Sequence, residues 1–220
     1  MNTKQKGFTL VEIAIVLVII GLLLGGILKG QEMITQAKIK NIMSDFSGIS
    51  AAYHGYQDRY RVLPGDDSGA ATRWSGAFAG DGDGVVEGTY NNATNGCPAT
   101  VVAATLETCK WWDHLRRAGF VSGSGGANPF NAVTGMLGVQ TGAGDGTGTA
   151  LGGFSGLLMC SANLPDKMAI AVDTQMDDGA PNTGTVRGMA QSAPNPAIAT
   201  SATSAYQETG TNTYTLCRAM

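Results

Sequence analysis

Residues 8–28 read FTLVEIAIVLVIIGLLLGGIL, and this stretch decides how the 220-residue chain is organised. Glu12 is its only charged residue. The stretch is long enough to span a bilayer as a helix, because roughly 20 apolar residues cross the ~30 Å hydrocarbon core. A cleaved secretory signal has a shorter apolar region, of about 7–15 residues, and a small-x-small cleavage site, and no such site follows Leu28. We therefore expect the segment to stay on the mature protein.

The remainder of the chain is acidic. Residues 61–220 carry eight Lys and Arg against thirteen Asp and Glu. A negatively charged surface repels phosphate, so nucleic-acid binding is disfavoured. The length suits one domain with an appendage rather than two domains with full cores. The composition thus predicts one apolar segment and one exported head.

The cysteines indicate an oxidising compartment. They are Cys97, Cys109, Cys160 and Cys217. All four follow the apolar segment, and an even number there favours two disulfides, although four cysteines permit three pairings. We favour Cys97 with Cys109, which closes a short loop, and Cys160 with Cys217, which ties down the C-terminus. Zinc ligation is the alternative, but the chain has no C-x₂-C spacing and only two histidines, His54 and His114.

A specific motif precedes the apolar segment. Residues 1–12 read MNTKQKGFTLVE, a short basic leader that ends at Gly7 and Phe8 and is followed by the lone acid Glu12. The motif resembles the processing site of type IV prepilins and type II secretion pseudopilins, in which a membrane peptidase cuts after the glycine and methylates the new N-terminal amine. The resemblance implies cleavage between Gly7 and Phe8 and methylation of the Phe8 amine.

Glu12 places a charged side chain within the apolar segment. A carboxylate there costs about 2.5–3.5 kcal/mol on insertion scales, so we expect it to have a partner. The resemblance implies that Glu12 pairs with the Phe8 amine of a neighbouring subunit in a filament. The alternative is that Glu12 merely extends to the membrane interface. The implied organisation is a leader at 1–7, a membrane and filament-core helix at 8–28, the outer half of that helix at 29–62 and a globular head at 63–220.

An apolar stripe continues the first helix beyond the membrane. Its members, spaced by three and four, are Ile39, Ile42, Phe46, Ile49, Tyr53, Tyr56 and Tyr60. The first helix breaker is Leu63-Pro64-Gly65, so the pattern predicts one helix from Phe8 to about Val62. We expect its outer half to lay the stripe against its own head domain, and a free coiled coil is the weaker alternative.

Two further helices are predicted in the head, at Leu106–Ala118 and Pro165–Asp177. In the first, Trp112 shares a face with other apolar residues, which predicts a core position. The Gly-, Ser-, Thr- and Asn-rich stretches 121–156 and 179–212 are expected to hold short strands joined by long loops.

Several head segments are also similar to those of larger pilin and pseudopilin heads. They are LPGDDSGAATRW at 63–74, GDGDG at 80–84, WWDHLRRAGFVSG at 111–123 and LPDKMAIAVDTQMDDGAPNTGTVRG at 164–188. The resemblance implies an α+β type IV pilin fold, with the long N-terminal helix packed on an antiparallel sheet.

The turn GDGDGVVEG is a candidate calcium site. Asp81, Asp83 and Glu87 offer clustered oxygen ligands, and major pseudopilins, which the chain resembles, bind calcium in a head loop. An EF-hand would need glycine at Val86 and glutamate at Asn92, so that template fails. The default interpretation is a solvated Asp-Gly turn.

A second acidic group, Asp173, Asp177 and Asp178, is more typical of a helix end at the surface than of a metal site. It places carboxylates at the unfavourable end of a helix dipole, for which the sequence offers no reason.

Catalysis has little support in the sequence. The string GGFSGL around Ser155 lacks the second glycine of a G-x-S-x-G elbow, and no phosphate-binding loop occurs. The chain is therefore expected not to be an enzyme.

The sequence favours a structural subunit of a type IV pilus or pseudopilus. The expected partners are copies of itself or related pilins, the prepilin peptidase and the inner-membrane assembly machinery. The expected location is the bacterial inner membrane, with the head periplasmic, and then the filament. The alternative is a minor tip pilin that binds a surface or a cargo through its long loops.

Overall fold

The computed structural model consists of two compact units. It describes residues 9–92, 96–103, 105–144 and 148–220. One unit extends to Lys38 and the other comprises Ile39–Met220. The first helix, α1 (Leu10–Tyr60), is continuous over 51 residues and contributes to both units. Its residues before Ile39 are largely exposed, whereas its later residues help to build the core of the head.

The predicted stripe on α1 forms one wall of that core. The members that are buried are Ile39, Ile42, Phe46, Ile49, Tyr53 and Tyr56. For these residues the prediction that α1 packs against its own head is confirmed, whereas Tyr60 is only half-buried. The helix ends at Tyr60, because Arg61 adopts the left-handed region (φ 62°) and Pro64 follows shortly after.

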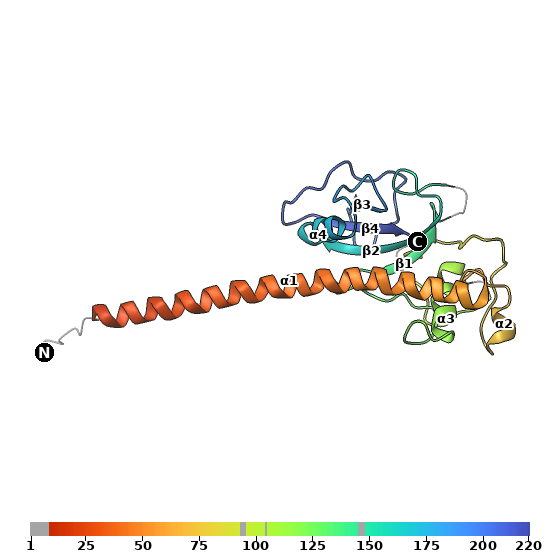
Figure 1. Ribbon diagram of the computed structural model, residues 1–220, viewed down its shortest axis with the longest axis horizontal. Coiled ribbons are helices and arrows are strands. Elements are labelled where there is room, and N and C mark those ends of the chain that lie inside the picture. The colour runs from red at the N-terminus through yellow and green to blue at the C-terminus, as the bar shows by residue number, and fades with distance from the viewer. Residues whose placement is uncertain (1–8, 93–95, 104, 145–147) are drawn as a thin grey trace, which may run out of the picture. The chain divides into compact units, whose positions relative to one another are not determined.

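A four-stranded antiparallel sheet forms the other wall. The strands are β1 (Leu137–Thr141), β2 (Leu157–Pro165), β3 (Val186–Ala190) and β4 (Thr213–Ala219). Their order is β1-β2-β4-β3, and every neighbouring pair is antiparallel. Figure 1 shows the second half of α1 running along one face of this sheet. The fold is therefore the expected α+β, pilin-like arrangement of a long N-terminal helix on an antiparallel sheet.

Both faces of the sheet are buried. Alternate strand residues, such as Val139, Met159 and Leu216, join the core formed with α1. The intervening residues, such as Leu158 and Met189, join a second cluster covered by loop residues. Strands were expected in 121–156 and 179–212. The two central strands, β2 and β4, lie outside these stretches, and their double burial explains why their sequences did not mark them. A strand buried on both faces lacks the apolar-polar alternation that marks a half-exposed one.

The head contains three shorter helices, α2 (Ala70–Arg73), α3 (Glu107–Arg117) and α4 (Asp166–Met176). The predictions for α3 and α4 are confirmed to within one residue at each end. Trp112 on α3 is fully buried, as predicted.

The disulfides join Cys97 to Cys109 and Cys160 to Cys217, with S–S distances of 2.09 and 2.12 Å. These are the pairings that the sequence favoured. The first bridge anchors a loop to α3, and the second links directly opposite residues of β2 and β4.

Candidate functional site

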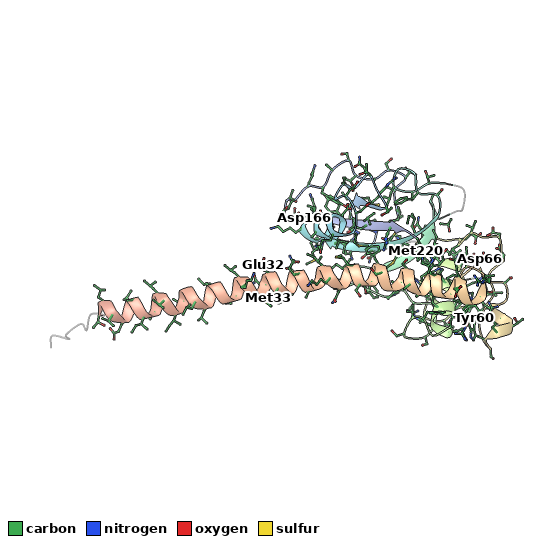
Figure 2. The ribbon with its side chains drawn as sticks, in the orientation of Figure 1. Glu32, Met33, Tyr60, Asp66, Asp166 and Met220 are labelled. Atoms are coloured by element: carbon green, nitrogen blue, oxygen red, sulfur yellow. A yellow bond between two sulfur atoms is a disulfide. The ribbon has the colours of Figure 1, made fainter. Side chains whose placement is uncertain are left out.

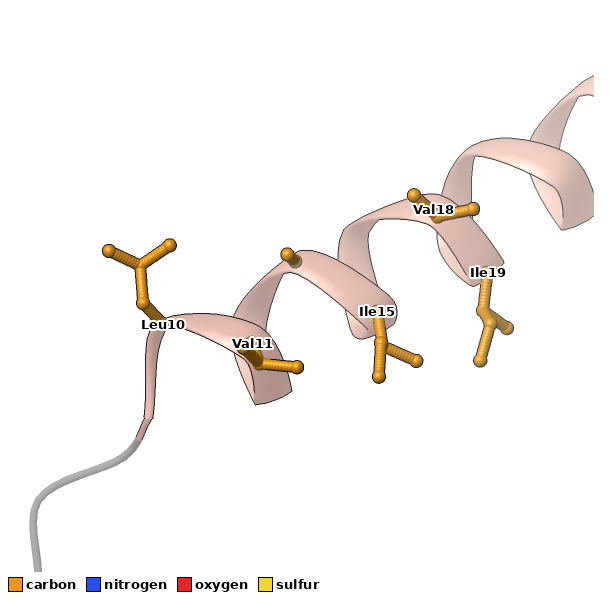
Figure 3. A pocket seen from close by; sticks show the side chains of 6 residues that line it. Leu10, Val11, Ile15, Val18 and Ile19 are labelled. Atoms are coloured by element: carbon orange, nitrogen blue, oxygen red, sulfur yellow. The ribbon is translucent and has the colours of Figure 1, made fainter.

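The first half of α1 presents an apolar surface that nothing in the described chain covers. It is long and apolar enough to cross a membrane, and none of its most apolar window is buried. Leu10 is 87% exposed and Leu28 67% exposed. Figure 3 shows Leu10, Val11, Ile15, Val18 and Ile19 lining a shallow apolar groove along this helix. Such a surface is stable only against lipid or against other apolar helices.

Thr9 and Glu12 form a capping box at the start of α1. The Thr9 backbone N–H and the Thr9 hydroxyl both donate to Glu12 Oε2 at 2.7 Å. The Glu12 backbone N–H donates to Thr9 Oγ1 at 3.3 Å. This T-x-x-E pattern satisfies N–H groups that have no partner within the helix. The box was not predicted above, although a Thr followed three positions later by a Glu is a recognisable sequence signal.

The capping box orients Glu12 but leaves its charge without a counter-ion. Glu12 makes no ion pair with any lysine or arginine in the described ranges. Gly7 and Phe8, the expected cleavage and methylation residues, lie outside the described residues. The structure thus shows a carboxylate that is held by Thr9 and has no counter-ion among the described residues.

The start of the chain was compared with known families. A model of the prokaryotic N-terminal methylation motif matches residues 2–28. The chain carries this methylation motif. It is typical of type IV pilins and pseudopilins, which agrees with the pilin-like fold. No curated protein and no solved structure matches the chain significantly. The methylation motif ends at the last residue of the apolar segment, so the interpretation of the head depends on its own geometry.

The first acidic cluster of the head forms where the loop after α1 meets the start of α3. Two overlapping groups of carboxylates, whose oxygens lie within 4.8 Å of one another, could hold a metal ion. One group is Asp66, Asp81 and Asp83, and the other is Asp81, Glu87 and Glu107. Asp66 follows closely on Tyr60, the last residue of α1 (Figure 2). The oxygen-only donor set is the kind that calcium prefers.

The predicted trio of Asp81, Asp83 and Glu87 does not form a single group. Asp81 belongs to both groups, whereas Asp83 and Glu87 belong to different ones. The missing members are Asp66 and Glu107, which are both buried. Sequence spacing could not reveal them, because Glu107 lies 26 residues from Asp81 and reaches it only through the fold.

Asp66 has a structural role in this cluster. Its Oδ1 accepts hydrogen bonds from the N–H groups of Gly82 (2.5 Å) and Asp83 (3.1 Å), and its Oδ2 accepts one from Gly84 (2.9 Å). Gly82 and Gly84 adopt positive φ values of 84° and 90°, which turn these amides inward. Asp66 therefore closes the Asp-Gly turn through these hydrogen bonds.

Glu107 is the most perturbed acid of the cluster. Its Oε1 accepts the Asp81 N–H at 3.0 Å, and its buried Oε2 has no hydrogen-bond partner among the residues that the structure describes. Burial first, and then the nearby Glu87 carboxyl, raises the pKa of Glu107 to about 8. Near neutral pH, therefore, either a proton or a cation can neutralise this group.

The second acidic cluster lies at the C-terminal end of α4. Oxygens of Asp173, Asp177 and Asp178 lie within 4.8 Å of one another. Asp173 is fully buried, and its Oδ2 accepts the Tyr206 hydroxyl at 2.5 Å. Burial first, and then the charges of Asp178 and Asp177, raises the pKa of Asp173 to about 6, while the Tyr206 hydroxyl and the Gly179 amide act in the opposite direction. This pKa lies below neutrality, so Asp173 is largely ionised at pH 7.

The histidines have structural surroundings. His114 is fully buried, accepts the Gly65 N–H at Nδ1 (3.0 Å) and lies 2.8 Å from the Phe78 carbonyl through Nε2. Burial is the largest cause that lowers the pKa of His114 to about 4. A neutral imidazole with both nitrogens engaged is part of the core. His54 is exposed on α1.

Proposed function

We propose that this protein is a structural subunit of a type IV pilus or of a secretion pseudopilus. The observation that carries the proposal is the methylation motif at the start of a helix whose apolar residues from Leu10 to Leu28 are all exposed. In this proposal a prepilin peptidase cuts between Gly7 and Phe8 and methylates the Phe8 amine. The chain then passes from the inner membrane, with its head periplasmic, into a filament, through the inner-membrane assembly machinery.

Assembly would replace lipid around Leu10–Leu28 with the same helices of neighbouring subunits. Both environments are apolar, so this exchange gains little from the hydrophobic effect and depends on packing and on polar contacts. An amine and a carboxylate that meet in such a bundle neutralise each other. The capping box supports this role for Glu12, because Thr9 holds its carboxylate in the exposed first turn of α1.

A matched pair of substitutions tests the assembly role. Glu12→Gln removes the charge in the apolar segment, and Glu32→Gln makes the same change on an exposed residue of the same helix, which pairs with Lys29 at 2.8 Å. We expect Glu12→Gln to reduce sheared filament strongly and Glu32→Gln to leave it near wild type. Equal filament yields from Glu12→Gln and wild type would refute the charge-pairing role.

Mass spectrometry of the mature protein tests the processing step. The expected mass corresponds to a chain that begins at N-methylated Phe8. Filaments built from chains that still begin at Met1 would refute the proposal. Immunolabelling of purified filaments then distinguishes the two kinds of subunit: label along the whole length indicates a main subunit, and label only at the tip indicates the minor tip pilin.

No enzymatic role is proposed, because pilins with this motif are structural proteins.

We propose in addition that the first acidic cluster binds calcium. Asp81, Glu87 and Glu107 support this, because the described chain offers them no lysine or arginine partner within 4.0 Å. Asp81→Asn is expected to remove one equivalent of bound calcium from the purified protein. An unchanged binding isotherm would refute this site.

A further inference from the structure

The second acidic cluster has three carboxylates where a helix already concentrates negative charge. α4 ends at Met176, and its last turn contains no basic residue. The unpaired carbonyls there make the C-terminal end of a helix equivalent to about half a negative charge. Asp177 is the C-cap, and Asp178 follows it. Three carboxylates at this end of the helix therefore repel one another and the helix dipole, and a cation among them would relieve that repulsion.

The fold supplies no such cation from its own side chains. None of the three carboxylates makes an ion pair with a lysine or arginine in the part of the chain that the structure describes. Arg187 is near enough to act on Asp178 electrostatically. Its guanidinium, however, donates to the carbonyls of Leu151 and Gly152 and lies over the Phe154 ring, 4.4 Å from the centroid.

Asp173 provides a second, independent indication of a ligand. It is fully buried, and no group in the described ranges makes a hydrogen bond with its Oδ1. Leaving a buried carboxylate oxygen unpaired is costly, because the group has lost its water. Its other oxygen is held by Tyr206, so the side chain cannot turn away without breaking that bond.

The other two carboxylates are held in place by backbone N–H groups. Asp177 Oδ2 accepts the N–H groups of Thr185 (2.5 Å) and Val186 (2.9 Å). Asp178 accepts the Ala180 N–H at Oδ1 (2.9 Å) and the Thr183 hydroxyl at Oδ2 (2.5 Å). Gly184 permits this closure, because a Cβ at that position would clash with the Asp177 carboxylate. Carboxylate oxygens have more than one lone pair, so these bonds orient the ligands without using them up.

We propose that Asp173, Asp177 and Asp178 bind a hard divalent cation of the calcium class, with Asp173 Oδ1 as the buried ligand. Oxygen-only donors in an irregular loop suit calcium, which accepts flexible geometry at 2.3–2.6 Å, better than magnesium, which demands a regular octahedron. The ion would tie the end of α4 to the start of β3 and, through Tyr206, to the long segment between β3 and β4.

Titration calorimetry of the full-length protein in detergent, after chelator treatment, tests the proposal with CaCl₂ as the titrant. We expect Asp173→Asn to lose one equivalent of calcium that wild type binds. Asp58→Asn makes the same change at an exposed residue of α1 and is expected to bind as wild type does. Calcium at about 100 times Kd is expected to raise the Tm of wild type by about 5–10 °C, and this shift is expected to be smaller in Asp173→Asn.

A second variant covers the case in which Asp173→Asn does not fold. Asp178 is exposed, so Asp178→Asn should fold normally and is expected to weaken calcium binding about 10-fold or more. Wild-type stoichiometry and affinity in both variants would overturn the proposal, and equal affinity for MgCl₂ would overturn the choice of calcium. Asp81→Asn separates this site from the first cluster, because the equivalent that depends on Asp173 should persist in that variant.

Discussion

Removing the Cys160–Cys217 disulfide is expected to destabilise the head more than removing the Cys97–Cys109 disulfide. A disulfide stabilises mainly by restricting the unfolded chain, and the restriction grows with the length of the loop that it closes. The two bridges join residues separated by 57 and 12 positions. Three of the four cysteines are fully buried and Cys97 is 8% exposed, so the loss of packing on substitution is similar for the two pairs.

The chain-entropy relation turns these separations into free energies of unfolding. It assigns about 4.2 kcal/mol to the Cys160–Cys217 bridge and about 2.8 kcal/mol to the Cys97–Cys109 bridge at 25 °C. The difference is about 1.4 kcal/mol. For a domain of this size, 1 kcal/mol changes Tm by about 2–4 °C. We therefore expect the Tm of the Cys160→Ala/Cys217→Ala variant to lie about 3–6 °C below that of Cys97→Ala/Cys109→Ala.

The assay is thermal unfolding of the full-length variants in detergent, followed by near-ultraviolet circular dichroism. Trp111 and Trp112, which are both fully buried, report the loss of tertiary packing. The Tm of wild type treated with reductant should match that of a variant that combines all four Cys→Ala changes. A Cys97→Ala/Cys109→Ala variant that melts at or below the Tm of the other double variant would refute the argument from loop length.

Two further predictions concern buried polar groups. The neutral form of His114 is favoured in the folded state, because its pKa is about 4 there and about 6.5 in the unfolded chain. Its stabilising contribution is present above pH 6.5 and is lost as pH falls towards 4, so between pH 7 and pH 5 wild type should lose about 2 kcal/mol more than His114→Asn in urea unfolding. Identical pH dependence in the two proteins would contradict this assignment. Tyr56→Phe removes the hydroxyl that donates to Asp67 Oδ2 at 2.5 Å, and Asp67 is only 1% exposed. We expect a loss of about 1.5–3 kcal/mol in the same assay, against little change for Tyr60→Phe at a half-exposed position. Equal effects of the two changes would show that the hydrogen bond to Asp67 is not the cause.

Much of the fold could be predicted from local sequence patterns. The spacing of apolar residues predicted the course of α1 and the stripe from Ile39 to Tyr56, because a helix repeats its faces every 3.6 residues. The same rule, with Gly119 as a C-terminal stop, placed α3 to within one residue, whereas α4 was placed from Pro165 as a first-turn residue. The central strands β2 and β4 could not be recognised from such a periodicity. Both of their faces are buried, so apolar and polar residues do not alternate along them.

The candidate sites also differ in whether local sequence or the tertiary fold creates them. The methylation motif lies within residues 2–28 and the capping box within Thr9–Glu12, so the amino-acid sequence by itself determined both. It also determined the apolar segment, which must be covered by lipid or by other subunits. The acidic clusters were decided only by the tertiary structure. Asp66, Asp81 and Glu107 come from three separate segments, and the buried state of Asp173 depends on Tyr206, 33 residues away. Burial and the proximity of other charges determine whether a carboxylate needs a proton or a cation. Both are properties of the folded chain, and the order of its residues does not reveal them.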